Sequence, residues 1–253
     1  MVFIGLWAAL FGAIIGSFLN VVIHRLPKEL SIVKPRSFCP SCNHTIPWYC
    51  NIPLLSFLFL RGRCSNCQIK ISWRYFWVEL LTALAALYIA RTTPLNSMFF
   101  LLFAFKLSVF SSLLALLFID LDHKILPNEL NLYLAVLMLI YALMHYNWQF
   151  WLLGAAIGFL FPLAVTWIFY LVRGEIGLGG GDIKLYSVLG IYLGPLGIIH
   201  NIFLSCMLGS IIGIVLLLAK RISRSDPIPF GPAIIIVAMI QIFTPSLLQQ
   251  LLP

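Results

Sequence analysis

Long apolar runs, separated by short polar loops, fill most of this sequence and leave little choice of fold class. Each run is close to the length that an α-helix needs to cross the hydrocarbon core of a bilayer. Only 9% of the residues are charged, whereas soluble domains contain roughly 25%. We therefore predict an all-α polytopic membrane protein with about eight transmembrane helices. The expected crossings are residues 2–23, 75–91, 97–119, 129–145, 150–172, 185–200, 202–219 and 229–250.

The basic residues predict how these helices are oriented. If the chain crosses alternately, one side of the membrane holds 14 of the 16 Lys and Arg residues. By the positive-inside rule that side is cytoplasmic, and both termini lie outside. The net charge of +8 is then a topology signal, and no nucleic-acid partner is implied. The tight connection expected at His200 and Asn201 leaves seven or nine crossings open. The predicted cytoplasmic segments are 24–74, 120–128, 173–184 and 220–228.

Four cysteines in the first polar loop form two Cys-x-x-Cys pairs with 21 residues between them. This spacing is typical of a tetrahedral zinc site with four thiolates. Such a site leaves no open position for a water molecule, so the zinc would be structural. Two disulfides or four free thiols are the alternatives, but a reducing cytosol disfavours disulfides. His44 and Cys50 lie between the pairs and could substitute as ligands. The predicted metal ligands are Cys39, Cys42, Cys64 and Cys67.

Two aspartates lie where apolar runs meet the predicted cytoplasmic face. The chain has only eight acidic residues, so the position of each is informative. Asp120 ends one apolar run, whereas Asp182 follows a glycine-rich segment and precedes another run. Ionisable residues at such depth are costly, which favours a functional interpretation. Two carboxylates brought together would share a proton and act as base and acid on a peptide bond.

The residues alone leave two alternatives open for this pair. Asp182 could instead be a helix N-cap, a common role for Asp before a helix. Asp122 competes with Asp120, although residues two apart point about 200° away from each other on a helix.

Several neighbours are candidate accessory or substrate-binding residues. Glycines beside Asp182 lack Cβ atoms and would let a substrate backbone approach closely. Glu175 and Lys184 flank these glycines and could pair with each other or hold the substrate, although exposed ion pairs usually contribute little. The candidates are Asp122, Glu175, Lys184, Gly179 and Gly181.

Several motifs in one order carry a family resemblance. The chain resembles the bacterial type IV prepilin peptidases, the bifunctional leader peptidase and N-methyltransferase group of the Gly-x-Gly-Asp intramembrane aspartyl proteases. The motifs are Gly16-Ser-Phe-Leu-Asn-Val-Val, Arg25-Leu-Pro, the two Cys pairs, Asn51-Ile-Pro, Leu60-Arg-Gly-Arg-Cys, Ile71-Ser-x-Arg-Tyr, Val78-Glu-Leu, Asp120-x-Asp, Pro127-Asn, and Glu175 through Asp182-x-Lys.

The resemblance implies a function and a division of the chain. Asp120 and Asp182 match the catalytic pair of the family. The implied substrates are type IV pilin-like or pseudopilin precursors, cut after a glycine at the cytoplasmic face of a bacterial plasma membrane. N-methylation of the new N-terminal residue would then use S-adenosylmethionine. The expected regions are a first helix (1–23), a cytoplasmic cysteine module (24–74) between helices 1 and 2, and a multi-helix membrane peptidase domain (75–253).

Two other functions can be weighed against a peptidase. A transporter could use Asp120, Asp182 and Lys106 as an ion relay, but it would be expected to carry midplane charges and paired repeats that the sequence does not have. A zinc-organised membrane scaffold would need the cysteines but not the aspartates. Cleavage of a precursor peptide separates the peptidase from both alternatives.

Overall fold

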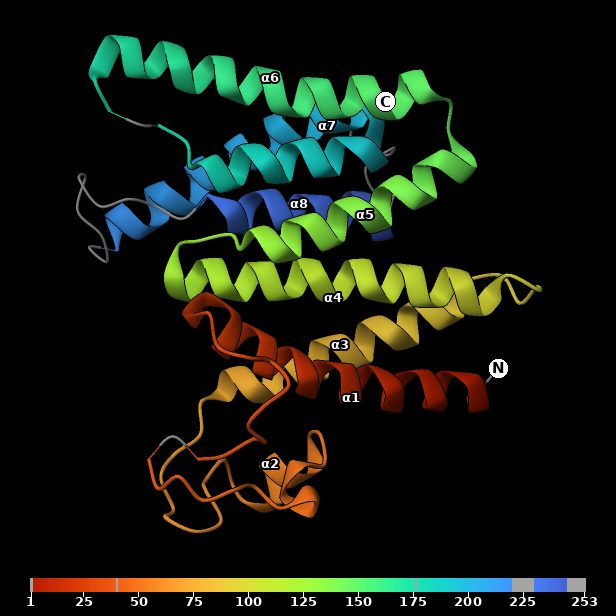
Figure 1. The fold of residues 1–253 in the computed structure, drawn as a ribbon, viewed down its shortest axis with the longest axis vertical. Helices are drawn as coiled ribbons and strands as arrows, with labels where there is room; N and C mark the ends of the chain where they lie inside the picture. Colours follow the sequence, from red (N-terminus) through yellow and green to blue (C-terminus); the bar gives the residue numbers. More distant parts are fainter. Residues whose placement is uncertain (1, 40, 176, 220–229, 245–253) are drawn as a thin grey trace. The chain divides into compact units, whose positions relative to one another are not determined.

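The computed structural model describes residues 2–39, 41–175, 177–219 and 230–244 (Figure 1). The chain divides into two compact units, unit 1 (Met1–Ala115) and unit 2 (Leu116–Pro253). The described residues form helices, and they contain no strand, only two isolated β-bridges. The elements are α1 (Val2–Arg25), η1 (Leu26–Lys28), η2 (Trp48–Asn51), α2 (Leu55–Phe59), α3 (Trp73–Thr92), α4 (Phe99–His123), α5 (Asn128–His145), α6 (Trp148–Arg173), α7 (Gly180–Leu218) and α8 (Gly231–Phe243).

Five of these helices are long and apolar enough to cross a membrane, namely α1, α4, α5, α6 and α7. This confirms the expectation of an all-α, multi-pass membrane protein. The apolar helix α8 is shorter, with 13 residues. The predicted basic loop at 220–228 and the end of the last predicted crossing lie outside the described residues.

In unit 1, helices α1 and α3 pack closely through glycines. A Cβ atom placed on Gly12 would lie 2.6 Å from the carbonyl oxygen of Thr82, and one on Gly16 would lie 2.7 Å from Cα of Glu79. Small residues of this kind let two membrane helices approach to backbone contact. The packed helices α1 and α3 therefore fix both ends of the loop that carries the cysteines.

In unit 2, α7 folds back on itself (Figure 1). Gly194 has φ 70° and ψ −175°, and Pro195 follows it. Tyr186 Oη lies 2.6 Å from Ser205 Oγ, although 19 residues of straight helix would span about 28 Å. The two halves, 180–193 and 195–218, therefore run in opposite directions.

The predicted turn at His200 and Asn201 was wrong, because both residues are helical and the reversal occurs at Gly194. Pro195 lacks the N–H that a continuous helix would use, and its ring would clash with an earlier carbonyl group. Gly194 supplies the positive φ that the turn needs.

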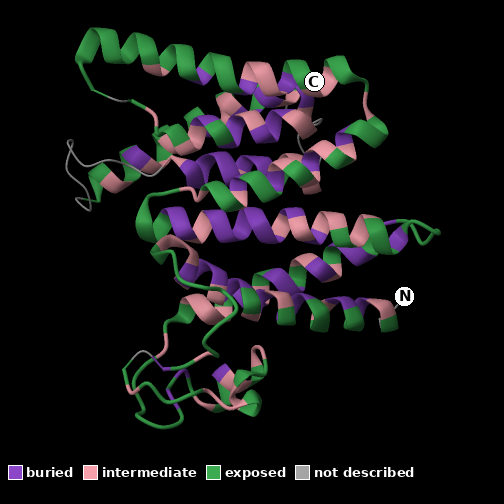
Figure 2. Cartoon of the chain, viewed as in Figure 1, coloured by how far each residue is buried: buried purple, intermediate pink, exposed green. Residues whose placement is uncertain are grey.

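Helices α6 and α8 flank this hairpin. Gly154 and Gly158 of α6 press against the backbone carbonyl oxygens of Gly190 and Tyr186. Buried residues concentrate on α7 and α8, whereas α6 is mostly exposed (Figure 2).

A polar link joins α8 to the second half of α7. Asn201 Nδ2 donates to Gln241 Oε1 (2.7 Å), and Gln241 Nε2 donates to the carbonyl oxygen of Gly197 (3.0 Å). This link holds α8 along the hairpin, so the position of its N-terminus is tied to α7.

Candidate active site and candidate metal centre

Asp120 lies in the last turn of α4 and is 5% exposed. Its Oδ2 atom is buried, and no described residue forms a hydrogen bond with it. A buried polar atom without a partner is costly and needs an explanation, such as a catalytic role or an ordered water. Asp120 is thus the kind of residue that a reaction centre would use.

Asp182 lies in the first turn of α7 and is half-buried. The N-cap of this helix is Gly179, not Asp182. A Cβ atom on Gly179 would lie 3.2 Å from Asp182 Oδ2, so glycine leaves room for the carboxylate there. The N-cap alternative therefore does not account for Asp182.

The two carboxyl groups converge on Gly231, the first residue of α8. A Cβ atom on Gly231 would lie 2.5 Å from Asp120 Oδ2 and 3.4 Å from Asp182 Oδ1. These distances to one point put the two oxygens no more than about 6 Å apart, within the range where one carboxylate affects the ionisation of another. Residues from three helix ends in unit 2 thus meet at one place.

Gly231 was not among the residues that we predicted from the sequence. It is buried, and its backbone N–H faces the Asp120 carboxyl group at the N-terminus of α8. That end of a helix carries positive partial charge, which favours a nearby carboxylate. The Gly231-Pro232 dipeptide at the start of an apolar run is a helix-start signal, but nothing local indicates that it contacts Asp120.

Three other predicted site residues do not contact the two carboxyl groups. Asp122 and Glu175 are exposed, unlike Asp120. Lys184 does not pair with Glu175; its Nζ donates to Asn128 Oδ1 (2.8 Å). This bond joins the start of α5 to the first turns of α7, which helps to hold the ends of the helices that carry the carboxylates.

Gly181 has a packing reason to be glycine. A Cβ atom there would lie 3.0 Å from Cβ of Leu126, in the segment between α4 and α5. By contrast, a Cβ atom on Gly180 would meet no atom within 4 Å. Gly181 therefore contributes to helix packing, and Gly180 leaves open space next to Asp182.

The four predicted cysteine ligands come together in unit 1. Their sulfur atoms all lie within 4.8 Å of one another, and Cys39 Sγ lies 3.8 Å from Cys67 Sγ. A zinc ion bound by four thiolates at about 2.3 Å would separate its ligands by about 3.8 Å, the edge of the tetrahedron. The geometry and the donor set fit zinc. The cluster consists of Cys39, Cys42, Cys64 and Cys67.

Two similar backbone turns build the cluster. In the first, the N–H of Asn43 donates to the carbonyl oxygen of Cys39, and in the second the N–H of Gln68 donates to that of Cys64. Asn43 (φ 54°) and Gln68 (φ 60°) both adopt the left-handed conformation. Isolated bridges, Phe38 with Thr45 and Arg63 with Lys70, close the two turns.

Hydrogen bonds to sulfur favour the thiolate form that a metal needs. The backbone N–H groups of Cys67 and Asn66 lower the pKa of the Cys64 thiol to about 6. The backbone N–H of His44 and the side-chain amide of Asn66 lower the pKa of Cys42. The pKa of Cys67 is instead raised to about 11 by desolvation and by the neighbouring thiols. Since thiolates are the metal ligands, a cation bound among the four sulfur atoms would favour the thiolate form of Cys67 too.

The chain is similar to known proteins along most of its length. Residues 10–93 match the Bacterial Peptidase A24 N-terminal domain, and residues 107–214 match the Type IV leader peptidase family. No solved structure matches. The chain is 40% identical over 259 residues to the prepilin leader peptidase/N-methyltransferase of Aeromonas hydrophila, covering 91% of this chain and 87% of the relative.

Two further relatives have the same name. The protein of Pseudomonas aeruginosa is 38% identical over 261 residues, which cover 91% of this chain and 87% of the relative. That of Bacillus subtilis is 40% identical over 230 residues, which cover 89% of this chain and 88% of the relative. Because these similarities extend over most of each protein, the chain belongs to the prepilin leader peptidase/N-methyltransferase family.

Proposed function

We propose that this protein is a membrane aspartyl endopeptidase that removes the leader of type IV prepilin-like precursors after a glycine and then N-methylates the new N-terminal residue. The observation that carries the peptidase half is the convergence of Asp120 and Asp182 on Gly231. Family membership supports both halves.

The proposed mechanism assigns complementary roles to the two aspartates. The ionised carboxylate would take a proton from a water molecule as that water attacks the scissile carbonyl carbon. The protonated carboxyl would donate its proton to the carbonyl oxygen, and later proton transfer to the amine would release the products. Which aspartate holds the shared proton is a property of the pair.

The surroundings of the pair suit an extended peptide substrate. Glycine at position 179 leaves room beside the Asp182 carboxylate. The N-terminus of α8 would stabilise negative charge on Asp120 through its backbone N–H. The exposed carboxylates of Asp122 and Glu175 would attract a basic leader, with effects that salt would screen.

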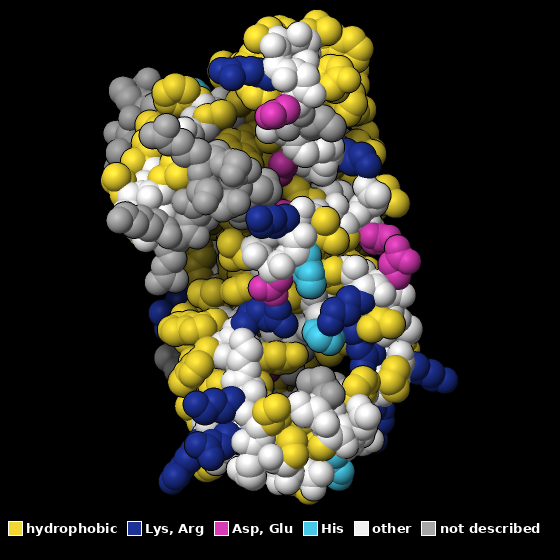
Figure 3. All heavy atoms as spheres, turned by 90° about the vertical axis from the view of Figure 1, so that its left-hand side faces the viewer, with side chains coloured by type: hydrophobic (Ala, Val, Ile, Leu, Met, Phe, Trp, Pro, Cys, Tyr) yellow, Lys and Arg dark blue, Asp and Glu magenta, His cyan; other side chains and the backbone are white. Residues whose placement is uncertain are grey.

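Charge supports a cytoplasmic location for this chemistry. Lys and Arg side chains are frequent over the loop between α1 and α3 in unit 1 (Figure 3). By the positive-inside rule, that loop and the loops beside Asp120 and Asp182 would face the cytoplasm of a bacterial cell, with both termini outside.

We also infer that the cysteine cluster holds one structural Zn²⁺. The spacing of 3.8 Å between two sulfur atoms and the lowered pKa of Cys64 support this assignment. Four thiolates would fill the coordination sphere, so the metal would order the loop without taking part in cleavage.

The methyl-transfer half is supported by the family, and no binding residues are assigned to it. S-adenosylmethionine would supply the methyl group. Its sulfonium carries a positive charge, whereas two cavities among the described residues of unit 1, each of about 390 Å³, are lined by arginines and by no acidic residue. These cavities do not match the charge of that cofactor.

Precursor processing in cells tests the peptidase proposal. Wild type and the variants Asp120→Asn and Asp182→Asn are expressed with a candidate prepilin, and Asp122→Asn is the matched control for charge. Uncut precursor should accumulate with the first two variants only. Full processing by either of them would refute the assigned roles.

A further inference from the structure

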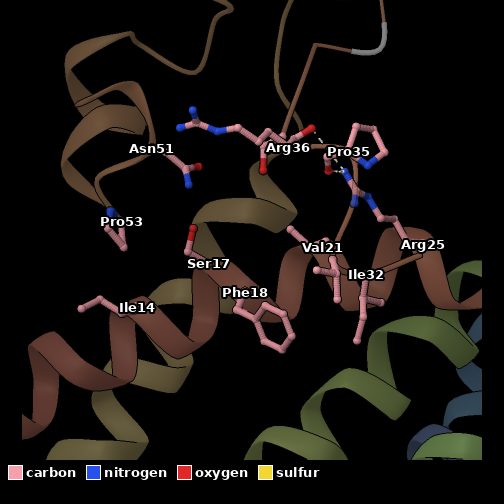
Figure 4. A pocket seen from close by; sticks show the side chains of 12 residues that line it. Ile14, Ser17, Phe18, Val21, Arg25, Ile32, Pro35, Arg36, Asn51 and Pro53 are labelled. Atoms are coloured by element: carbon pink, nitrogen blue, oxygen red, sulfur yellow. Dashed lines mark hydrogen bonds between the residues drawn. The ribbon is translucent and has the colours of Figure 1, made fainter. Parts of the chain in front are cut away.

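A cavity of about 390 Å³ in unit 1 lies between α1 and the loop that follows it (Figure 4). Its floor is apolar and comes from Ile14, Phe18 and Val21 of α1. Its other walls come from the loop, namely from Ile32, Val33, Pro35, Arg36, Ser37, Asn51 and Pro53. Neither the carboxylate pair nor the cysteine cluster lines this cavity.

A buried cation lies in the wall of the cavity. Arg25 is 8% exposed, and its guanidinium donates to the carbonyl oxygens of Ser31 (2.9 Å) and Pro35 (2.8 Å). These bonds hold the loop against the end of α1, but carbonyl groups do not neutralise the charge. Among the described residues, no carboxylate lies within ion-pair distance of Arg25. A buried charge without a counter-charge is costly, so the wall is electrostatically suited to an anion.

Further hydrogen-bond donors line the same space. Figure 4 shows the Arg36 side chain extending towards Asn51, with the Ser17 hydroxyl below them. The Arg36 guanidinium and the Asn51 amide can donate to phosphate oxygens, whereas the Ser17 hydroxyl is hydrogen-bonded to the carboxylate of Glu79. No acidic residue lines the cavity itself. The buried Glu79 behind Ser17 accepts hydrogen bonds from Ser17 and from the backbone N–H of Leu54, so the donors left for an anion are those of Arg36 and Asn51.

The floor of the cavity indicates a lipid rather than a soluble anion. Ile14 and Phe18 are 58% and 49% exposed on an apolar helix that is long enough to span the membrane. In a bilayer such a surface would face acyl chains, whereas Arg25 ends the apolar helix, where lipid phosphate groups would be within reach. One ligand would satisfy both if it carried a negative head and an apolar tail.

We propose that this cavity binds an anionic phospholipid, with its phosphate on Arg36 and Asn51 next to the charge of Arg25. One acyl chain lies along Ile14 and Phe18. The site is separate from the carboxylate pair, so the proposal does not depend on the proteolytic function.

Native mass spectrometry of the purified full chain tests the proposal. The protein in mild detergent is titrated with phosphatidylglycerol or phosphatidylcholine of the same acyl chains, and bound lipid is counted. Phosphatidylglycerol should bind more tightly. Arg36→Gln should weaken its binding by about tenfold, the effect of one charge-assisted hydrogen-bonded contact. Arg61→Gln, an equal charge change on an exposed residue of the same loop, should change it less than about twofold.

Four results would overturn the proposal. The first two are equal binding of the two lipids and equal effects of the two Arg variants. The third is displacement of the lipid by millimolar glycerol phosphate, which would indicate a site for free anions. The fourth is displacement by S-adenosylmethionine, which would indicate a methyl-transfer site. Zinc content checks that the loop stays folded in each variant. If Arg36→Gln loses zinc, Asn51→Ala removes a single neutral donor and should still weaken phosphatidylglycerol binding selectively.

Discussion

The four cysteines of unit 1 come from 29 consecutive residues, whereas the carboxylate pair of unit 2 joins residues 62 positions apart and meets Gly231 a further 49 positions along. Two short backbone turns build the cluster. The pair depends instead on how the ends of α4, α7 and α8 pack. Changes in the packing of these helix ends should therefore lower cleavage but leave metal binding unchanged. Loss of a cysteine ligand should abolish metal binding but leave most of the cleavage activity.

Among changes that keep both aspartates, the largest effect is expected from Gly231→Ala. Its Cβ atom would lie 2.5 Å from Asp120 Oδ2, so the Asp120 carboxyl group must shift, and a misplacement of about 1 Å can lower a rate about 100-fold. The measurement is kcat/KM for cleavage of a prepilin peptide, with zinc content expected to stay unchanged.

Gly180→Ala is the matched control for this change. A Cβ atom at position 180 would meet no atom within 4 Å, so activity should stay within about threefold of wild type, as for substitutions away from critical contacts. Equal losses for the two variants would argue against a special role for Gly231.

Cys64→Ser, in contrast to Gly231→Ala, should affect zinc binding more than cleavage. Removal of one of four thiolates should abolish stoichiometric zinc binding. Cleavage should fall by about tenfold at most, because the cluster shares no residue with the carboxylate pair and such sites act nearly independently. Metal analysis of the purified protein and the same cleavage assay measure the two effects. Cys206→Ser, outside the cluster, should keep its zinc. Retention of full zinc by Cys64→Ser would contradict the assignment.

A smaller effect is expected from Lys184→Met, which removes the 2.8 Å bond to Asn128. An exposed bond of this kind contributes modestly, and we expect a loss of about fivefold in kcat/KM. Asn128→Ala should give a similar loss, and the double variant should be no worse than either single one. If the loss of kcat/KM in the double variant equalled the product of the two single losses, the two residues would act separately.

Asp122→Asn should have the smallest effect. The side chain is exposed, so any attraction of a basic leader is screened, and KM should rise by about twofold or less in physiological salt. A loss of kcat comparable with that of Asp120→Asn would contradict the accessory role that we infer from the exposed position of Asp122.

The sequence could predict the cysteine cluster because its geometry is local. Spacing within each pair and between the pairs was enough to indicate one tetrahedral site, and the sulfur atoms do converge. The α-helical, multi-pass fold was also predictable, since long apolar runs in a bilayer must satisfy their backbone hydrogen bonds internally.

The remaining features depend on contacts between distant segments. Family motifs, not spacing, favoured Asp120 over Asp122, and no local signal connected Gly231 with either carboxylate. The reversal in α7 was placed at His200 instead of Gly194 because the apolar pattern continues across both positions, so hydropathy could not locate the turn. Only the Gly194-Pro195 dipeptide indicated it.

A double-variant cycle tests most directly whether Asp120 and Asp182 act as one catalytic unit. The quantities to compare are kcat/KM for prepilin peptide cleavage by purified wild type, Asp120→Asn, Asp182→Asn and the double variant, at equal zinc content. If the carboxylates share one task, each single change should remove about as much activity as both together. Losses that multiply, or substantial activity in either single variant, would contradict the proposed pair.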